Sequence, residues 1–185
     1  MASVFRAGNT ALITGGASGI GLALAKKCHG HGMRVAIVDI NKEHLELAKK
    51  SMGERTSVFS VDVSKLEEWK GLKKRVEEEF GLWSHLFSIA YLLFYSQHSL
   101  RSQKGKIDLL ALNAGIGLRG SWPDTSYFHK VIDTNLFGVI HGISTFLPSI
   151  QSTASASSPA AIVITGSKQG ITCLLYTSPS PRDTR

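Results

Sequence analysis

Thr14-Gly15-Gly16-Ala17-Ser18-Gly19-Ile20-Gly21 is the stretch that decides the fold. It follows the apolar run 11–13 and precedes a run of helix-forming residues, 22–27, so the pattern predicts a strand, a glycine-rich turn and a helix. In such a turn the missing Cβ atoms let a pyrophosphate approach the backbone at the start of the helix. Glycine-rich turns also occur where nothing binds, so the motif alone leaves both interpretations open.

An acidic residue further along the chain favours the nucleotide interpretation. The next apolar run, residues 35–38, ends directly before Asp39, which comes 18 residues after Gly21. This spacing is typical of an acid that binds the ribose of a dinucleotide. The two signals together predict a βαβ nucleotide-binding unit.

Length and composition indicate a globular protein with one domain. The chain has 185 residues, of which 43% are hydrophobic and 19% are charged. Its longest apolar concentration, residues 82–96, is interrupted by Ser84, His85 and Ser88, so we predict no membrane span. The net charge of +7 comes from basic residues interspersed with glutamates, which is typical of solvated helix faces and predicts no nucleic-acid partner.

The cysteines carry little chemical signal. The N-terminus lacks a cleavable signal pattern, so we expect a cytoplasmic, reducing location in which Cys28 and Cys173 stay thiols. Their spacing does not suit metal ligation, and we predict no metal site. Cys28, within a helical stretch, is expected to be a small core residue.

The remaining periodicity alternates between strands and helices. We expect strands at 11–14, 34–38, 57–61, 107–112 and 161–165, and helices at 19–29, 41–51, 64–80 and 126–147. This alternation predicts an α/β fold, a Rossmann-type doubly wound parallel sheet with its ligand at the carboxyl ends of the strands.

Local signals set several of the helix boundaries. Asn41 is expected to cap the second helix, and the spacing of Ser64-Lys65-Leu66-Glu67 predicts a capping box for the third. In that third helix we expect four side chains to face the core: Leu66, Trp69, Leu72 and Val76. Pro148 is expected to end the fourth helix.

With these motifs in this order, the chain resembles the short-chain dehydrogenase/reductase family of Rossmann-fold, NAD(P)-dependent oxidoreductases. The matching segments are the turn 14–21, the pair Asp62-Val63 and the segment Leu112-Asn113-Ala114-Gly115. The resemblance implies hydride transfer between a nicotinamide cofactor and a small-molecule alcohol or carbonyl substrate. It assigns cofactor contacts to Thr14, Gly15, Ser18, Gly19, Ile20, Gly21, Asp39, Asp62, Val63, Asn113, Ala114 and Gly115.

Two further residues match catalytic positions of the family. Asn135 falls where the family has a structural and catalytic asparagine, and Ser167 falls where it has a serine that binds the substrate oxygen. A satisfied helix asparagine and an ordinary turn serine are the competing interpretations. We expect NAD to be preferred over NADP, because the Asp39 carboxylate would repel a 2′-phosphate and no Arg or Lys lies within residues 14–21.

Two segments depart from the family pattern. Residues 82–105 lie where the family runs directly from Phe80-Gly81 to Lys106-Ile107, and we interpret them as an in-frame, non-native insertion rather than a lid or a membrane-docking helix. Residues 173–185 resemble translated adapter sequence. The sequence therefore predicts a dinucleotide-binding domain over residues 1–172 whose sheet is incomplete at its C-terminus.

The family's Tyr-x-x-x-Lys motif has no match after Ser167. The residue four positions after Tyr176 is Ser180, and Lys168 is the last lysine. We therefore expect an oxidoreductase chain without measurable turnover, and a non-catalytic dinucleotide-binding module is the alternative. Intact relatives form homo-oligomers through the helix that carries this motif, so we expect no defined oligomer here.

Overall fold

The computed structural model describes residues 3–92, 106–117 and 125–167. Five strands form one parallel sheet in the order β3-β2-β1-β4-β5. The strands are β1 (Thr10–Thr14), β2 (Arg34–Asp39), β3 (Thr56–Ser60), β4 (Leu109–Leu112) and β5 (Ala161–Ile164). Strand order reverses at β1, which has β2 on one side and β4 on the other, so the predicted doubly wound α/β fold is confirmed.

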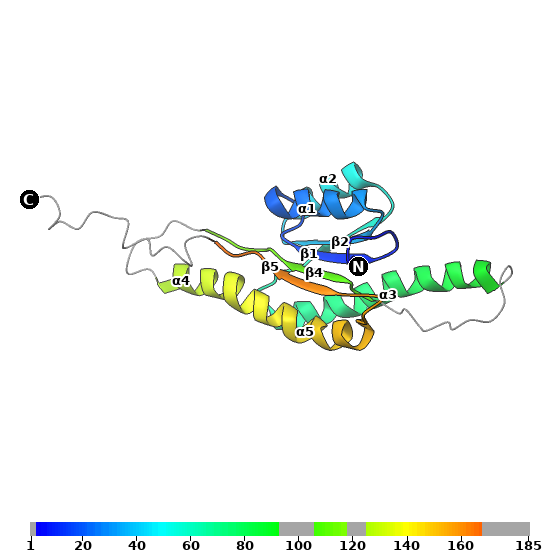
Figure 1. Ribbon diagram of the computed structural model, residues 1–185. Coiled ribbons are helices and arrows are strands. Elements are labelled where there is room, and N and C mark those ends of the chain that lie inside the picture. The colour runs from blue at the N-terminus through cyan, green and yellow to red at the C-terminus, as the bar shows by residue number, and fades with distance from the viewer. Residues whose placement is uncertain (1–2, 93–105, 118–124, 168–185) are drawn as a thin grey trace, which may run out of the picture.

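Helices cover both faces of the sheet (Figure 1). On one face lie α1 (Gly19–Gly30) and α2 (Lys42–Met52), and on the other lie α3 (Leu66–Leu92) and α5 (Gly138–Thr153). A continuous helical run leads into α5 through α4 (Thr125–Ile132) and the π-helical segment η1 (Asp133–Phe137). Within the described residues, each helix falls short of the length or apolar character needed to cross a bilayer.

Alternation along the strands builds a separate core under each helical layer. Ala11 and Ile13 of β1 pack with the α1 and α2 layer, whereas Leu12 packs with the α3 and α5 layer. Cys28 is fully buried in the first of these cores, as expected, and burial raises the pKa of its thiol to about 11. Burial on both faces explains why the middles of β1 and β2 and all of β4 are apolar.

Trp69 joins the second core to the end of β3. Its ring is fully buried and meets Phe146 of α5 edge-on, with the ring centroids 6.2 Å apart. Its indole Nε1 donates to the carbonyl oxygen of Val63 at 2.8 Å. This bond fixes the backbone just after β3, which is part of the predicted nucleotide site.

The start of α3 differs from the prediction. Asn41 caps α2 as expected, accepting from the His44 N–H at 3.0 Å, but Ser64 and Glu67 do not form a capping box. The Ser64 hydroxyl donates to Asp62 Oδ1, and Glu68 rather than Glu67 reaches back, accepting from the Asp62 N–H at 2.6 Å. Glu67 pairs instead with Lys70.

The core-facing residues of α3 and its end also differ in part. Trp69, Leu72 and Val76 are fully buried, whereas Leu66, at the first turn, is 38% exposed. The helical backbone continues past Phe80 to Leu92, into the predicted insertion. Gly81 costs a helix only about 1 kcal/mol and residues 82–92 contain no proline, so nothing forces a stop at Phe80. The rest of that insertion, 93–105, and the predicted tail with Cys173 lie outside the described residues.

Pro148 does not end the last helix as predicted but lies inside α5. A proline removes one helical hydrogen bond and crowds the preceding turn. Phe146 and Ile150 flank it and are both buried against the sheet, so their burial keeps the chain helical to Thr153. Tertiary packing here outweighs the local signal.

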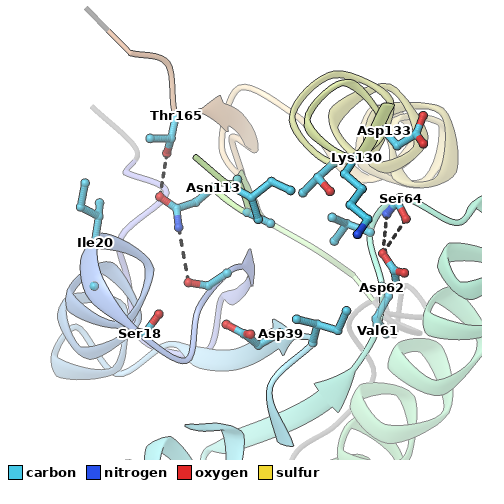
Figure 2. Close-up of a pocket in the computed structure, with 18 residues that line it drawn as sticks. Ser18, Ile20, Asp39, Val61, Asp62, Ser64, Asn113, Lys130, Asp133 and Thr165 are labelled. Carbon is cyan, nitrogen blue, oxygen red and sulfur yellow. Dashed lines mark hydrogen bonds between the residues drawn. The ribbon is translucent and has the colours of Figure 1, made fainter. Parts of the chain in front are cut away.

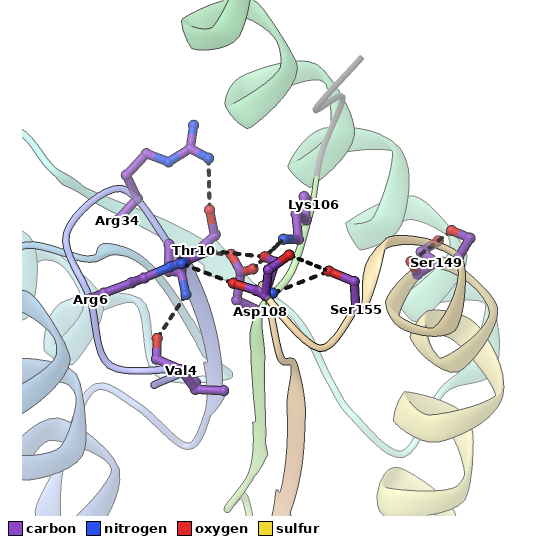
Figure 3. Close-up of polar contacts among 12 residues, drawn as sticks. Val4, Arg6, Thr10, Arg34, Lys106, Asp108, Ser149 and Ser155 are labelled. Carbon is purple, nitrogen blue, oxygen red and sulfur yellow. Dashed lines mark hydrogen bonds and ion pairs between the residues drawn. The ribbon is translucent and has the colours of Figure 1, made fainter. Parts of the chain in front are cut away.

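Polar contacts tie the amino ends of the strands together at the opposite edge of the sheet from the predicted site (Figure 3). Asp108 is buried, and its Oδ2 accepts from the Thr10 N–H at 2.9 Å while Lys106 Nζ lies 2.8 Å from its Oδ1. Arg34 donates to the Thr10 hydroxyl at 2.8 Å. These bonds hold β1, β2 and β4 in register from their starting ends.

Candidate functional site

A cleft of about 650 Å³ lies at the carboxyl ends of the strands (Figure 2). Loops that follow β1, β2, β3, β4 and β5 form its floor and sides, and α4 with η1 forms the far wall. The lining residues are Gly15, Ser18, Gly19, Ile20, Asp39, Ile40, Val61, Asp62, Val63, Ser64, Asn113, Ala114, Gly115, Ile116, Lys130, Asp133, Thr134 and Thr165. Parallel sheets bind ligands at this edge, where the strand order reverses.

The glycine-rich turn brings the start of α1 to the cleft. Gly19 has φ of +51°, and no atom of the described residues lies within 4 Å of where its Cβ would be. At Gly21, by contrast, a Cβ would lie 2.1 Å from the carbonyl oxygen of Gly15. Gly19 therefore leaves space on the cleft side, whereas Gly21 allows the turn to pack closely and does not itself line the cleft.

The N-terminus of α1 is free to meet a ligand. Ser18 is its N-cap residue, yet within the described residues its side chain makes no capping hydrogen bond. The side chain of Ile20 is 71% exposed. Unpaired N–H groups and the positive end of the helix dipole make such a terminus suitable for an anion.

The Asp39 carboxylate is held in place by two backbone N–H groups. Oδ2 accepts from Ala17 at 3.2 Å and Oδ1 accepts from Asn41 at 3.1 Å. Asp39 thus links the end of β2 to the glycine-rich turn and faces the middle of the cleft (Figure 2). A carboxylate oxygen has further lone pairs, so these bonds leave it able to accept from a ribose hydroxyl.

Asp62 is organised by its own loop. Its Oδ1 accepts from the Ser64 N–H at 3.0 Å and from the Ser64 hydroxyl at 2.6 Å, and Lys65 Nζ lies 3.4 Å from Oδ2. Burial acts to raise the pKa of Asp62, but these hydrogen bonds and the nearby ammonium together hold it below its ordinary value. Asp62 is therefore ionised at neutral pH.

Asn113 connects the glycine-rich turn to the end of β5. Its Nδ2 lies 3.3 Å from the Thr14 carbonyl oxygen and donates toward it, and its Oδ1 accepts from the Thr165 hydroxyl at 3.0 Å. Thr14 itself is buried and does not line the cleft. Its hydroxyl accepts from the N–H groups of Asn113 and Ala114 at 2.9 and 3.0 Å, so it positions the loop from behind.

The two residues matched to catalytic positions lie outside the cleft lining. Asn135, in η1, binds both backbone polar groups of Ile116, with its Nδ2 donating at 2.9 Å and its Oδ1 accepting at 2.8 Å. Ser167 is exposed, three residues beyond the end of β5, and Thr165 lines the cleft in its place. The structure therefore gathers the other predicted site residues but not Thr14, Gly21, Asn135 or Ser167.

The far wall was not predicted from the sequence. Lys130, Asp133 and Thr134 line it, and Ile40, Val61, Ser64, Ile116 and Thr165 complete the cleft beside predicted residues. The spacing of positions 130, 133 and 134 places them on one face of a helix. Because Asn135 is next to them and was predicted as a site residue, this spacing could have identified them from the sequence. Among the described residues no three His, Cys, Asp or Glu side chains cluster as metal ligands.

Comparison with known proteins relates the chain to one family. The family profile described as short chain dehydrogenase matches residues 9–90 and 96–178. A mitochondrial borneol dehydrogenase from Lavandula x intermedia is 32% identical over 166 residues, which cover 83% of this chain and 54% of that protein. The chain spans about half the length of the curated relatives that it matches over most of its residues.

Solved structures show the same fold. A 3-ketoacyl-(acyl-carrier-protein) reductase from Brucella melitensis, complexed with NADH, aligns with a TM-score of 0.72 at 23% identity, covering 88% of this chain and 58% of that one. A short chain dehydrogenase/reductase from Burkholderia phymatum, in complex with NAD, aligns with a TM-score of 0.66 at 26% identity, covering 90% of this chain and 52% of that one.

Proposed function

Because the chain belongs to the short-chain dehydrogenase family, we propose that its cleft binds a nicotinamide dinucleotide for oxidation or reduction of a small alcohol or carbonyl compound. The observation that carries this proposal is the start of α1, which opens into the cleft with Gly19 presenting no side chain. The Burkholderia relative holds NAD, which supports the same class of ligand here.

The residues of the cleft fit such a ligand from one end to the other. The N–H groups at the start of α1 would hold the pyrophosphate, Asp39 would accept from the adenosine ribose, and Asp62 with Val63 would contact the adenine. The part of the cofactor that extends toward β5 would contact Asn113, Ala114 and Gly115. The bound nicotinamide supplies or takes up the hydride.

Two residues outside the cleft lining would have separate roles: one would position a loop of the cleft, and the other would contact the substrate. Asn135 would hold the loop at Ile116, through the two hydrogen bonds already described. Ser167, carried over from the family pattern, would donate to the substrate oxygen and polarise it. Both assignments follow the order of motifs along the chain.

NAD is the preferred cofactor in this proposal. Asp39 is fixed at the end of β2 by Ala17 and Asn41, so its negative charge cannot swing away from a ribose 2′-phosphate. A 2′-hydroxyl would instead donate to it. The preference therefore rests on a carboxylate that the backbone holds in position.

Titration of the chain with NADH and NADPH tests the cofactor assignment. We expect tighter NADH binding, and Asp39→Ala should lessen the difference between the two cofactors. Glu43→Ala is the matched control, because Glu43 is an exposed carboxylate in the first turn of α2 and outside the cleft lining. Tighter NADPH binding by the wild-type chain would refute the preference, and no binding of either cofactor would refute the site.

Nucleotide binding without catalysis is the second candidate function. One observation favours it: Ser167 does not line the cleft. The chain would then bind the cofactor without exchanging a proton with a substrate. Assays of binding and of turnover on the same sample separate the two functions.

Residues 82–105 are proposed to be an insertion into the domain, and residues 173–185 a non-native tail. The first boundary rests on the family pattern, in which Phe80-Gly81 is followed directly by Lys106-Ile107. The family profile nevertheless matches residues 9–90 and resumes at 96, so part of the segment aligns with the family. Deletion of residues 82–105 should leave NADH affinity unchanged, and a large loss would show that the segment belongs to the domain.

A further inference from the structure

Lys130 gives the cleft a positive charge on its far wall. It extends from α4 into the cleft, with its amine toward the side that carries Asp62 and Ser64 (Figure 2). Among the described residues that line the cleft, it is the single lysine or arginine, whereas Asp39, Asp62 and Asp133 contribute three carboxylates.

The amine of Lys130 is available to a ligand. Lys130 is exposed, and no carboxylate in the described part of the chain lies within ion-pairing distance of its amine. Asp133 lies three residues along the same helical run, but its carboxylate points the other way in Figure 2. Asp62 is already engaged by Ser64 and Lys65.

The position of Lys130 identifies which part of a dinucleotide it could meet. Ser18 and Ile20 lie on one side of the cleft, Lys130 lies on the other side with Asp62 and Ser64, and Asp39 lies between them (Figure 2). The pyrophosphate belongs at the start of α1, on the side away from Lys130. A phosphate within reach of Lys130 would therefore be one attached to the adenosine ribose.

Resting on the proposed function, we propose that Lys130 is a specificity-determining residue that binds a ribose 2′-phosphate and lets the cleft accept NADP(H) as a second cofactor. Asp39 repels the phosphate from the floor, and the ammonium of Lys130 attracts it from the far wall. The backbone N–H groups of Ala17 and Asn41 already offset part of the charge of Asp39. Asp39 thus makes NAD the preferred cofactor, and Lys130 reduces the difference in affinity between NAD and NADP.

Two nucleotides that differ only in the 2′-phosphate test this role directly. The dissociation constants of 5′-AMP and adenosine 2′,5′-bisphosphate are measured by calorimetry for the wild-type chain and for Lys130→Gln. We expect Lys130→Gln to weaken bisphosphate binding about three- to ten-fold while 5′-AMP binding changes less than about two-fold. Lys130→Arg should retain most of the bisphosphate affinity, because it keeps the charge.

Lys26→Gln is the matched control, since Lys26 is an exposed lysine on α1 outside the cleft lining. It should leave both dissociation constants unchanged, and circular dichroism should show both glutamine variants folded. Equal changes for the two nucleotides, or no change for the bisphosphate, would overturn the role of Lys130 while NADH binding by the wild-type chain stands. If the wild-type chain binds none of these nucleotides, the proposed function fails and this inference fails with it.

Discussion

Asn135 and Ile116 are joined by a pair of hydrogen bonds that attaches the loop after β4 to η1. The amide Nδ2 donates to the Ile116 carbonyl oxygen at 2.9 Å, and Oδ1 accepts from the Ile116 N–H at 2.8 Å. Ile116 lines the cleft, so a side chain outside the lining fixes one of its walls. The same pair connects the π-helical segment with the sheet, and a π segment in a helix often accompanies a functional site.

Replacement of Asn135 by leucine should loosen this wall. Both bonds are lost, and because the pair is exposed to solvent we expect the free energy of unfolding to fall by only about 1 kcal/mol. NADH affinity should fall as well. Asn135→Asp keeps the acceptor and removes the donor, so its chemical-denaturation midpoint should lie between those of the wild type and Asn135→Leu. Identical midpoints for all three chains would contradict a holding role.

Gly21→Ala should be strongly destabilising even though alanine favours helices. Its Cβ would lie 2.1 Å from the Gly15 carbonyl oxygen and 2.7 Å from Asn113 Nδ2, so the turn has to move. We expect a loss of about 2–4 kcal/mol in urea unfolding. Gly30→Ala, at the other end of α1, is the control, because no described atom lies within 4 Å of the added Cβ. That control should be neutral or stabilising by up to about 1 kcal/mol, and equal losses at the two positions would refute the packing argument.

The first half of the fold follows closely from local sequence signals. Strand, glycine turn, helix and Asp39 were all expected, because each depends on neighbours in the chain: apolar runs buried in a parallel sheet, an Asn41 cap and glycines where a Cβ collides. The same locality explains why most of the residues expected to contact a cofactor line the cleft. They sit directly after strands, at the edge where ligands bind.

The structure departs from the sequence-based expectations where contacts between residues far apart in the chain determine the local structure. Burial of Phe146 and Ile150 carries the helix through Pro148, and no local pattern reveals that compensation. Thr14 is buried behind the cleft and bonds to the loop at Asn113, and its expected contact with the cofactor stays a prediction. Lys130 was not predicted because it lies on a helix that forms the far wall of the cleft. The positions of the strand ends do not indicate which face of that helix lines the cleft.

The bond between Ser64 and Asp62 should make stability depend on pH. Ionised Asp62 has a pKa below its ordinary value of 3.8 in the folded protein, so its stabilising contribution is complete above about pH 5 and is lost as the pH falls through the folded value. Ser64→Ala removes the hydroxyl donor and should bring the pKa of Asp62 closer to its ordinary value. The variant should therefore lose about 1–2 kcal/mol at pH 7 and less than that at pH 3.

Ser152→Ala provides the control for this titration. The Ser152 hydroxyl donates to the Ser149 carbonyl oxygen on an exposed helix turn, so no carboxylate is involved. Its effect on the free energy of unfolding should be small and the same at both pH values. A Ser64→Ala deficit that is equal at pH 3 and pH 7 would show that the hydroxyl contributes packing rather than stabilisation of the ionised Asp62.

An exposed apolar face on η1 and α5 should make the chain associate without a defined size. Leu136 is 53% exposed and Ile140 is 46% exposed; Phe137 of η1 and Ile132, the last residue of α4, are 43% and 45% exposed. The double variant Leu136→Gln/Ile140→Gln should lower the scattered intensity of the sample. Leu47→Gln, at a position on α2 that is 63% exposed and lies outside this face, should not. A monodisperse dimer in light scattering of the wild-type chain would contradict this expectation.

The last prediction concerns turnover. The groups proposed to bind the cofactor surround the cleft, whereas the proton donor of the family pattern has no match after Ser167, so binding and chemistry should separate in this chain. A general acid is worth about 10²–10⁴-fold in rate. We expect NADH to bind, with turnover of an alcohol panel with NAD at least about 10²-fold below that of a form extended with a Tyr-x-x-x-Lys segment. Tyr→Phe in the extended form should abolish that gain. Tyr176→Phe in the present chain should change nothing, and a fall in its turnover would identify Tyr176 as the proton donor and overturn this prediction.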